Sequence, residues 1–274
     1  MKTVSILNLK GGVGKTFTTV NMAYELWRRG YKVLLIDNDK QGNLSKAYGR
    51  YDADSLSPAA KLLSGEWEQP EKTEGSWCGL YELIQPTDYE GIDIITANMS
   101  LLGATWRLTA EETENQINRY SKLAELESVK GYYDYCIIDN PPDVGLNVVN
   151  ALAITDEVIV PVKIDAWALE GLDILAEQIE DAKQYNPRLR LRGVLITAYQ
   201  NTDGEAAGLE WLQKDWLEKK QTGQRGYQIL GVIRYSKKVA ESTFLFKPIY
   251  EYSPCCGAAQ SYKKFVTEYT GKGR

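Results

Sequence analysis

The sequence predicts an α/β fold in which a single domain, residues 1–274, is built on a mostly parallel, twisted sheet with helices on both faces. Three observations lead to this prediction. Short apolar runs alternate with helical patterns along the chain. A glycine-rich loop joins the first apolar run to the first helical pattern. Two of the runs end in aspartate, which places carboxylates at the sheet edge where ligands of such folds gather.

The first strand, loop and helix form the most informative stretch. Residues 3–7 are an apolar run typical of a strand, and residues 20–27 place apolar side chains on one helical face. Between them, residues 10–16 read K-G-G-V-G-K-T. Glycines carry no Cβ, so successive backbone N–H groups can turn inward around phosphate oxygens. This order of strand, loop and helix predicts a nucleotide-binding site.

Two side chains of this loop have chemistry that a nucleotide site needs. Lys15 can reach the β- and γ-phosphates, and the Thr16 hydroxyl can ligate Mg²⁺. We therefore expect ATP and Mg²⁺ as cofactors. The expected nucleotide contacts from this stretch are Lys10, Gly11, Gly12, Val13, Gly14, Lys15, Thr16 and Phe17.

The remaining elements follow in alternation. Residues 55–58, S-L-S-P, begin a predicted short helix that carries Ala60, Leu62 and Leu63, and an acidic loop is expected over residues 64–75. Further strands are predicted at 32–36, 92–95, 133–138, 157–162, 192–197 and 228–233. Further helices are predicted at 101–129 with breaks, 172–182, 209–216 and 258–269.

Aspartates follow two of the predicted strands. Asp37 and Asp39 come after the strand at 32–36, and Asp139 comes directly after the apolar residues of the strand at 133–138. A buried strand that delivers a carboxylate beside a glycine-rich loop is a Walker B pattern, and it places Asp139 in the Mg²⁺ shell. The weight of this pattern comes from the loop upstream, because many strands end in aspartate.

Composition excludes several classes of protein. The chain has no histidine, which removes histidine-based triads and metal sites, and its net charge of −5 restricts DNA binding to a local basic patch. The four cysteines show no C-x-x-C spacing, so we expect a reduced, cytoplasmic protein. We also expect no signal peptide and no membrane span.

Three motifs together resemble the ParA/MinD family of ATPases, and most closely ParA-type partition proteins that lack an N-terminal helix-turn-helix. The loop at 10–16 is similar to the deviant Walker A motif of that family. Residues 37–43, D-N-D-K-Q-G-N, resemble its switch I, with Lys40 in place of proline. Residues 139–145, D-N-P-P-D-V-G, resemble its switch II, with Asp143 where serine is common.

The resemblance implies a role for each matching residue. Lys10 would cross the interface of an ATP-bound dimer to the partner's phosphates, while Lys15 acts within its own subunit. Thr16 and, through water, Asp139 would hold Mg²⁺. The resemblance further implies catalytic roles for Lys10, Lys15 and Asp39, and Asp39 would position the attacking water. Asp37 would support the metal site. A segment that matches the family poorly would contact adenine through Arg234 and Tyr235.

The family also implies partners and a function. It predicts a slow, Mg²⁺-dependent ATPase for plasmid or chromosome partition that binds DNA non-specifically as an ATP-bound homodimer. Hydrolysis would be stimulated by a ParB-like centromere-binding protein, and the protein would be cytoplasmic and nucleoid-associated. The candidate DNA contacts are Lys214, Lys219, Lys220, Arg225, Lys237 and Lys238.

Other functions were weighed on the same residues. A ParA-like ATPase that positions another cargo fits the motifs equally, because cargo identity resides in the partner. A MinD-like membrane switch needs a C-terminal amphipathic helix, and the modest apolar content of residues 262–274 argues against it. A nitrogenase-type iron protein needs cluster-ligating cysteines, but Cys78 and Cys136 do not occupy the switch positions.

Overall fold

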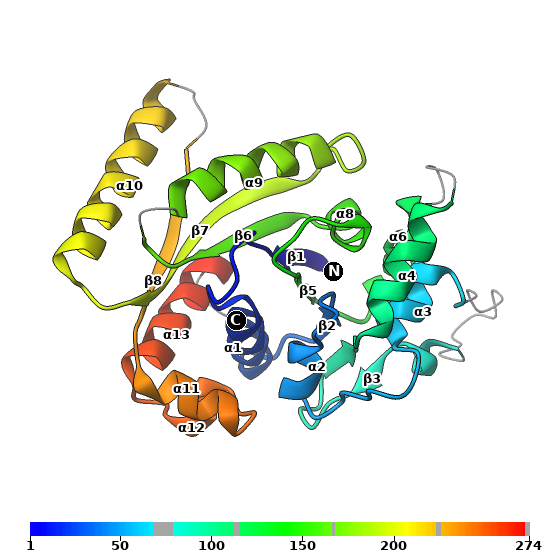
Figure 1. Ribbon diagram of the computed structural model, residues 1–274. Helices are drawn as coiled ribbons and strands as arrows, with labels where there is room; N and C mark the ends of the chain where they lie inside the picture. Colours follow the sequence, from blue (N-terminus) through cyan, green and yellow to red (C-terminus); the bar gives the residue numbers. More distant parts are fainter. Residues whose placement is uncertain (68–78, 112–115, 166–167, 223–225, 272–274) are drawn as a thin grey trace.

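A computed structural model describes residues 1–67, 79–111, 116–165, 168–222 and 226–271 (Figure 1). The described residues contain one eight-stranded sheet with the strand order β3-β4-β2-β5-β1-β6-β7-β8. Most of the predicted acidic loop, from residue 68 onward, lies outside the described residues. The strands are β1 (Lys2–Ile6), β2 (Val33–Asp37), β3 (Gln85–Pro86), β4 (Ile92–Ile95), β5 (Tyr135–Asp139), β6 (Glu157–Val162), β7 (Arg190–Tyr199) and β8 (Ile229–Arg234).

The sheet is parallel except at one edge. β1 lies near the centre and pairs in parallel with β5 and β6, while the two-residue β3 pairs antiparallel with β4. Every residue of β2 and of β6 is buried. Strands covered on both faces need apolar side chains at successive positions, which explains the continuous apolar runs in the sequence. The prediction of a mostly parallel sheet is confirmed.

Helices cover both faces, as predicted. Val33 and Leu35 of β2 pack in the core that includes α1 and α13, whereas Leu34 and Ile36 pack on the opposite side with α3, α4 and α6. The helices are α1 (Lys15–Arg28), α2 (Asn43–Ala47), α3 (Pro58–Ser64), the 3₁₀ helix η1 (Leu80–Glu82), α4 (Ser100–Thr109), α6 (Arg119–Ala124), α7 (Glu127–Lys130), α8 (Leu146–Ala153), α9 (Ala168–Ala182), α10 (Asp203–Thr222), α11 (Lys237–Phe244), α12 (Ile249–Tyr252) and α13 (Gly257–Thr270).

Several described helices have no counterpart in the sequence prediction: the short α2, η1 and α12, and the longer α8 and α11. α8 is eight residues long, and its buried Asn147 and Asn150 interrupt the apolar pattern that would have marked it. α11 buries only Ser242 among its described residues, so it has no apolar stripe to recognise. The stretch predicted as a broken helix over 101–129 is divided into α4, α6 and α7.

The strand order brings three loops to one edge of the sheet. Ile6 at the end of β1 and Asp37 at the end of β2 both pair with Asp139 at the end of β5. The glycine-rich loop, the loop before α2 and the loop before α8 therefore leave the sheet side by side. This edge is the place where the predicted site residues meet.

Candidate nucleotide site

The glycine-rich loop connects β1 to α1. Gly12 and Gly14 have φ angles of +71° and +84°, a left-handed conformation that residues with a Cβ adopt at a cost. The Val13 carbonyl accepts a 2.9 Å hydrogen bond from the Thr197 hydroxyl of β7, which fastens the loop to the sheet. Backbone N–H groups at the start of α1 form the positive end of the helix, where an anion is stabilised.

Lys15 lies beneath this loop. Its side-chain amine donates hydrogen bonds of 3.1 Å to the Asn8 carbonyl and 2.9 Å to the Lys10 carbonyl. Burial lowers the pKa of Lys15, and carboxylates led by that of Asp139 oppose this shift. The amine is therefore held within the loop in a position suited to the phosphates predicted to bind there.

The pKa of Asp139 is raised further than that of Asp37. Its side chain is 1% exposed, and burial together with the charge of Asp37 raises its pKa to about 8. A hydrogen bond from Thr16 and the charge of Lys15 act in the opposite direction. A buried carboxylate whose ionised form is this poorly compensated is a place where a cation is strongly stabilised.

Asp37 fixes the loop that follows β2. One carboxylate oxygen accepts hydrogen bonds from the backbone N–H and the hydroxyl of Ser45, at 2.8 and 2.7 Å, and the other accepts one from the Asp39 N–H at 3.2 Å. Burial raises the pKa of Asp37 to about 7 despite these bonds. Asp37 therefore orients the loop that follows β2, next to Asp139 in the strand register.

The donors at this edge fit Mg²⁺. The Thr16 hydroxyl and the Asp139 carboxylate offer hard oxygen ligands, and a cation would relieve the repulsion between Asp139 and Asp37. The described residues hold no group of three or more histidine, cysteine, aspartate or glutamate side chains that could bind a metal. Mg²⁺ in nucleotide sites commonly takes its other ligands from phosphates and water, so two protein oxygens suffice.

A cavity of about 630 Å³ opens in front of the loop. It is bounded by the glycine-rich loop, the loop before α2, the loop before α8 and the end of α11, so Asp39 lies in the same cavity as Lys15. Its lining includes Gly12, Lys15, Thr16, Asp39, Lys40 and Asp143.

An ion pair spans this cavity. The Lys40 amine lies 3.5 Å from a carboxylate oxygen of Asp143, which joins the loop after β2 to the loop after β5. Both residues are departures from the switch motifs that the chain resembles. Sequence reasoning left the role of Asp143 open, and its contact with Lys40 links the two departures.

Lys10 is not among the residues that line this cavity. Its amine lies 2.6 Å from both carboxylate oxygens of Asp165, which follows β6, and both side chains are about 40% exposed. Asp165 was missed at the sequence level, although it follows a buried strand as Asp37 and Asp139 do. Lys10 is therefore held by its own chain in this conformation.

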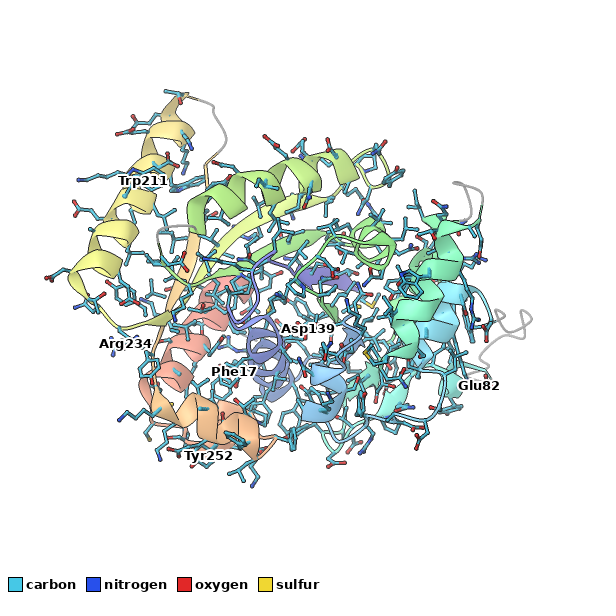
Figure 2. The ribbon with its side chains drawn as sticks, viewed as in Figure 1. Phe17, Glu82, Asp139, Trp211, Arg234 and Tyr252 are labelled. Carbon is cyan, nitrogen blue, oxygen red and sulfur yellow. The ribbon has the colours of Figure 1, made fainter. Side chains whose placement is uncertain are left out.

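A second hollow, of about 240 Å³, shares Gly12, Gly14 and Phe17 with the first cavity. Arg234 and Tyr235, at the end of β8, line it together with Gly12 and Phe17. Figure 2 shows Phe17 on α1 and Asp139 toward the centre of the molecule, with Arg234 farther out along β8. The segment predicted to contact adenine is thus placed beside the loop.

The predicted DNA contacts fall into two separate groups. Lys214, Lys219 and Lys220 lie on α10, which precedes β8, whereas Lys237 and Lys238 begin α11, which follows it (Figure 1). Strand β8 therefore separates the two groups. Arg225 lies outside the described residues.

Several of these lysines already have acidic partners. Lys214 pairs with Glu210 at 2.7 Å, and Lys219 pairs with Asp215 at 3.0 Å, each within α10. Lys238 pairs with Glu241 at 2.7 Å. Local pairing lowers the positive potential that each lysine offers to DNA.

Two observations bear on the alternatives. Within the described chain, every helix is too short or too polar to cross a bilayer. Cys136 is buried and Cys255 is exposed, both as free thiols, whereas Cys78 lies outside the described residues. Burial raises the pKa of Cys136 to about 12, which keeps that thiol protonated and unreactive.

Comparisons with known proteins agree with this geometry. A family model described as an AAA domain matches residues 1–191. The chain is 31% identical to "Chromosome partitioning protein ParA" of Caulobacter vibrioides, over all of this chain and 96% of that protein. It is 32% identical to "Sporulation initiation inhibitor protein Soj" of Bacillus subtilis, over 99% of each chain.

A solved structure gives a further match. Cobyrinic acid a,c-diamide synthase from Mycobacterium smegmatis, with bound ATP analog and magnesium, superimposes with a TM-score of 0.73 at 26% identity. The match covers 99% of this chain and 96% of the synthase. The full-length similarity to ParA and Soj, together with the P-loop geometry, shows that the chain belongs to the ParA-type family of ATPases.

Proposed function

We propose that this protein is an ATP-dependent dimeric switch in plasmid or chromosome partition, with the whole chain, residues 1–274, acting as one ATPase domain. The observation that carries the proposal is the convergence of Lys15, Thr16, Asp39 and Asp139 at one sheet edge, around the nucleotide loop. ATP binding with Mg²⁺ is further supported by the matching synthase, whose structure holds an ATP analog and magnesium. The name of the Caulobacter relative, a chromosome partitioning protein, supports a role in partition.

The side chains have distinct tasks in the proposed hydrolysis of ATP to ADP and phosphate. Lys15 binds the β- and γ-phosphates, and Thr16 and Asp139 hold Mg²⁺. Bound Mg²⁺ supplies positive charge to the phosphates. Asp39 orients the attacking water. Phosphoryl transfer depends mainly on positioning and charge stabilisation, so a site without histidine is sufficient.

Lys10 couples nucleotide binding to dimerisation in this proposal. Its amine leaves Asp165 and reaches the phosphates bound by a second copy of the chain. Because the nucleotide then contacts both subunits, ATP stabilises the dimer and the dimer stabilises bound ATP. Hydrolysis converts the shared ATP to ADP and phosphate, and the loss of the γ-phosphate contact returns the protein to monomers.

Size-exclusion chromatography and phosphate-release assays with Mg-ATP test the switch. Lys10→Ala should abolish ATP-dependent dimers, whereas Asp39→Ala should retain dimers and lose turnover by about 10²-fold or more. Lys183→Ala changes a partly exposed lysine just after α9 that pairs with Glu180; it is the matched control and should behave as wild type. Normal dimers in Lys10→Ala would refute the proposed role of the loop.

The ATP dimer is further proposed to bind duplex DNA non-specifically, as a cytoplasmic and nucleoid-associated protein whose hydrolysis a ParB-like partner stimulates. Membranes have no part in this cycle. Since the lysines of α10 and α11 form separate groups, Lys219→Ala/Lys220→Ala and Lys237→Ala/Lys238→Ala should be tested apart. A salt titration of DNA binding with ATP and with ADP is the measurement. Equal binding in both nucleotide states would contradict the proposal.

A further inference from the structure

A second charged site lies at the opposite end of the sheet from the nucleotide loop. Lys2, Glu157 and Arg190 are the first residues of β1, β6 and β7, three adjacent strands. The strands are parallel, so these positions share the amino edge, whereas the glycine-rich loop leaves the carboxyl edge. Nothing in the proposed ATPase cycle uses these residues.

Glu157 is the centre of this cluster. Its side chain is only 4% exposed, and its carboxylate contacts the Lys2 amine at 2.9 Å and the Arg190 guanidinium at 3.0 Å. The Tyr269 hydroxyl donates a further hydrogen bond of 2.8 Å. Arg192 lies 3.9 Å from the same carboxylate and donates to the Gln228 side chain at 2.9 Å.

These side chains line a hollow of about 400 Å³. Among the described residues, its lining contains the three cations Lys2, Arg190 and Arg192 but the single carboxylate of Glu157. This is an excess of two positive charges in a chain whose net charge is −5. Trp216 of α10 forms part of the wall. The hollow is therefore concave, basic and partly aromatic.

Strand β7 has a β-bulge beside this hollow. The pairing of β6 with β7 passes from Val158 and Leu191 to Ile159 and Gly193, so Arg192 is the extra residue of a β-bulge. Gly193 has a φ of +150°, and a Cβ there would lie 2.3 Å from the Gln228 carbonyl. Bulges redirect side chains, and this one adds Arg192 to a hollow that Arg190 already lines.

The charge pattern identifies the ligand chemistry. Arginine guanidinium groups present several N–H donors in a plane, which suits the oxygens of a phosphate group. Glu157 holds the cations in place but offsets only one of their three charges. The remaining excess of two matches the charge of one phosphate dianion or of two singly charged phosphodiesters of a nucleic acid backbone. A structural cluster alone would be served by equal numbers of opposite charges.

We propose that this hollow at the amino edge of the sheet binds a phosphate group, supplied either by a small phosphorylated anion or by the backbone of a nucleic acid. The proposal is independent of ATP hydrolysis at the opposite edge. Lys2, Arg190 and Arg192 contact the phosphate oxygens, and Glu157 orients these three side chains.

Titration with inorganic phosphate tests the proposal directly. Calorimetry and thermal unfolding are run with saturating ADP and Mg²⁺, so that the glycine-rich loop is already occupied, and with sodium chloride as the ionic-strength control. Arg190→Ala/Arg192→Ala should weaken phosphate binding by about tenfold or more, through the loss of charge-assisted hydrogen bonds. Arg188→Ala removes a nearby exposed arginine that does not line the hollow, and should bind as wild type.

Two further variants distinguish a loss of phosphate binding from a loss of folded structure. Arg190→Gln alone changes a side chain that is 68% exposed, so the fold is retained while phosphate binding should weaken. Glu157→Gln keeps a side-chain oxygen that can still accept hydrogen bonds from the cations but removes the competing negative charge, so phosphate should bind more tightly than to wild type. Equal phosphate affinity in wild type and both arginine variants would overturn the proposal, as would weaker binding in Glu157→Gln.

A labelled short duplex distinguishes the two sources of phosphate. If the duplex loses affinity in Arg190→Ala/Arg192→Ala and is displaced by inorganic phosphate, the nucleic acid backbone is the ligand. If the duplex binds equally to both proteins while phosphate binding remains arginine-dependent, a small phosphorylated anion is the ligand. Binding of neither probe in the hollow would overturn the proposal.

Discussion

The two ends of the central sheet both bury carboxylates, but they compensate them differently. At the carboxyl edge, burial raises the pKa of Asp139 to about 8 and that of Asp37 to about 7. At the amino edge, burial also acts to raise the pKa of Glu157. Hydrogen bonds from Lys2 and Tyr269, followed by the charges of Lys2 and Arg190, nevertheless hold that pKa below its usual value.

The carboxyl edge therefore has an excess of negative charge, whereas the amino edge has an excess of positive charge. Asp37 and Asp139 are neighbours in the strand register, and Lys15 offsets only part of their negative charge. An external cation such as Mg²⁺ relieves that imbalance. Glu157 is surrounded by three cations, so the imbalance there has the opposite sign and favours an anion. The free energy of unfolding should respond to pH in opposite directions at the two ends.

The largest pH effect is expected from Asp139. Because its folded-state pKa lies near 8 and its usual value is 3.8, the folded protein retains a proton that the unfolded chain releases between these pH values. Stability should therefore fall as pH rises through this window, by up to about 1.4 kcal/mol per pH unit. Asp139→Asn should flatten this slope in thermal unfolding without nucleotide, and Mg-ATP should flatten it in wild type. An unchanged slope in Asp139→Asn would break the comparison.

A smaller effect of opposite sign is expected from Glu157. Its pKa is lowered in the folded protein, so its contribution to stability is present above the usual value of 4.5 and is lost as pH falls below it. Glu157→Gln should be less stable than wild type near neutral pH, and the difference should shrink in acid. Chemical unfolding at several pH values measures this. A difference that grows in acid would contradict the assignment.

The smallest effect is expected from the ion pair between Lys40 and Asp143. Both side chains are partly exposed, at 33% and 59%, so their coupling should be roughly 0.2–1 kcal/mol. A double-mutant cycle with Lys40→Ala and Asp143→Ala, read in both unfolding and ATP affinity, measures it. Coupling in the ATP affinity would show that the pair links the two loops at the cavity. If the effects of the two substitutions add in both unfolding and ATP affinity, the ion pair between Lys40 and Asp143 contributes to neither.

Much of the carboxyl edge was predictable because its signals are local. The run from residue 10 to 16 specifies a tight loop through its glycines, and it places Lys15 and Thr16 at the start of a helix whatever the rest of the chain does. Asp37 and Asp139 each end an apolar strand, so parallel pairing alone predicted that they would share an edge. α8 was missed because its buried asparagines interrupt the apolar pattern.

The sequence by itself therefore determined the class of fold, the nucleotide loop and the carboxylates beside it, since each depends on neighbours within a few residues. Only the tertiary structure decided which distant charges meet: Lys10 with Asp165, Lys40 with Asp143, and Glu157 with three cations from β1 and β7. It also separated the lysines of α10 from those of α11 by placing them at opposite ends of β8. The reason is that strand order and register fix such pairs, and hydrophobic periodicity carries no information about either.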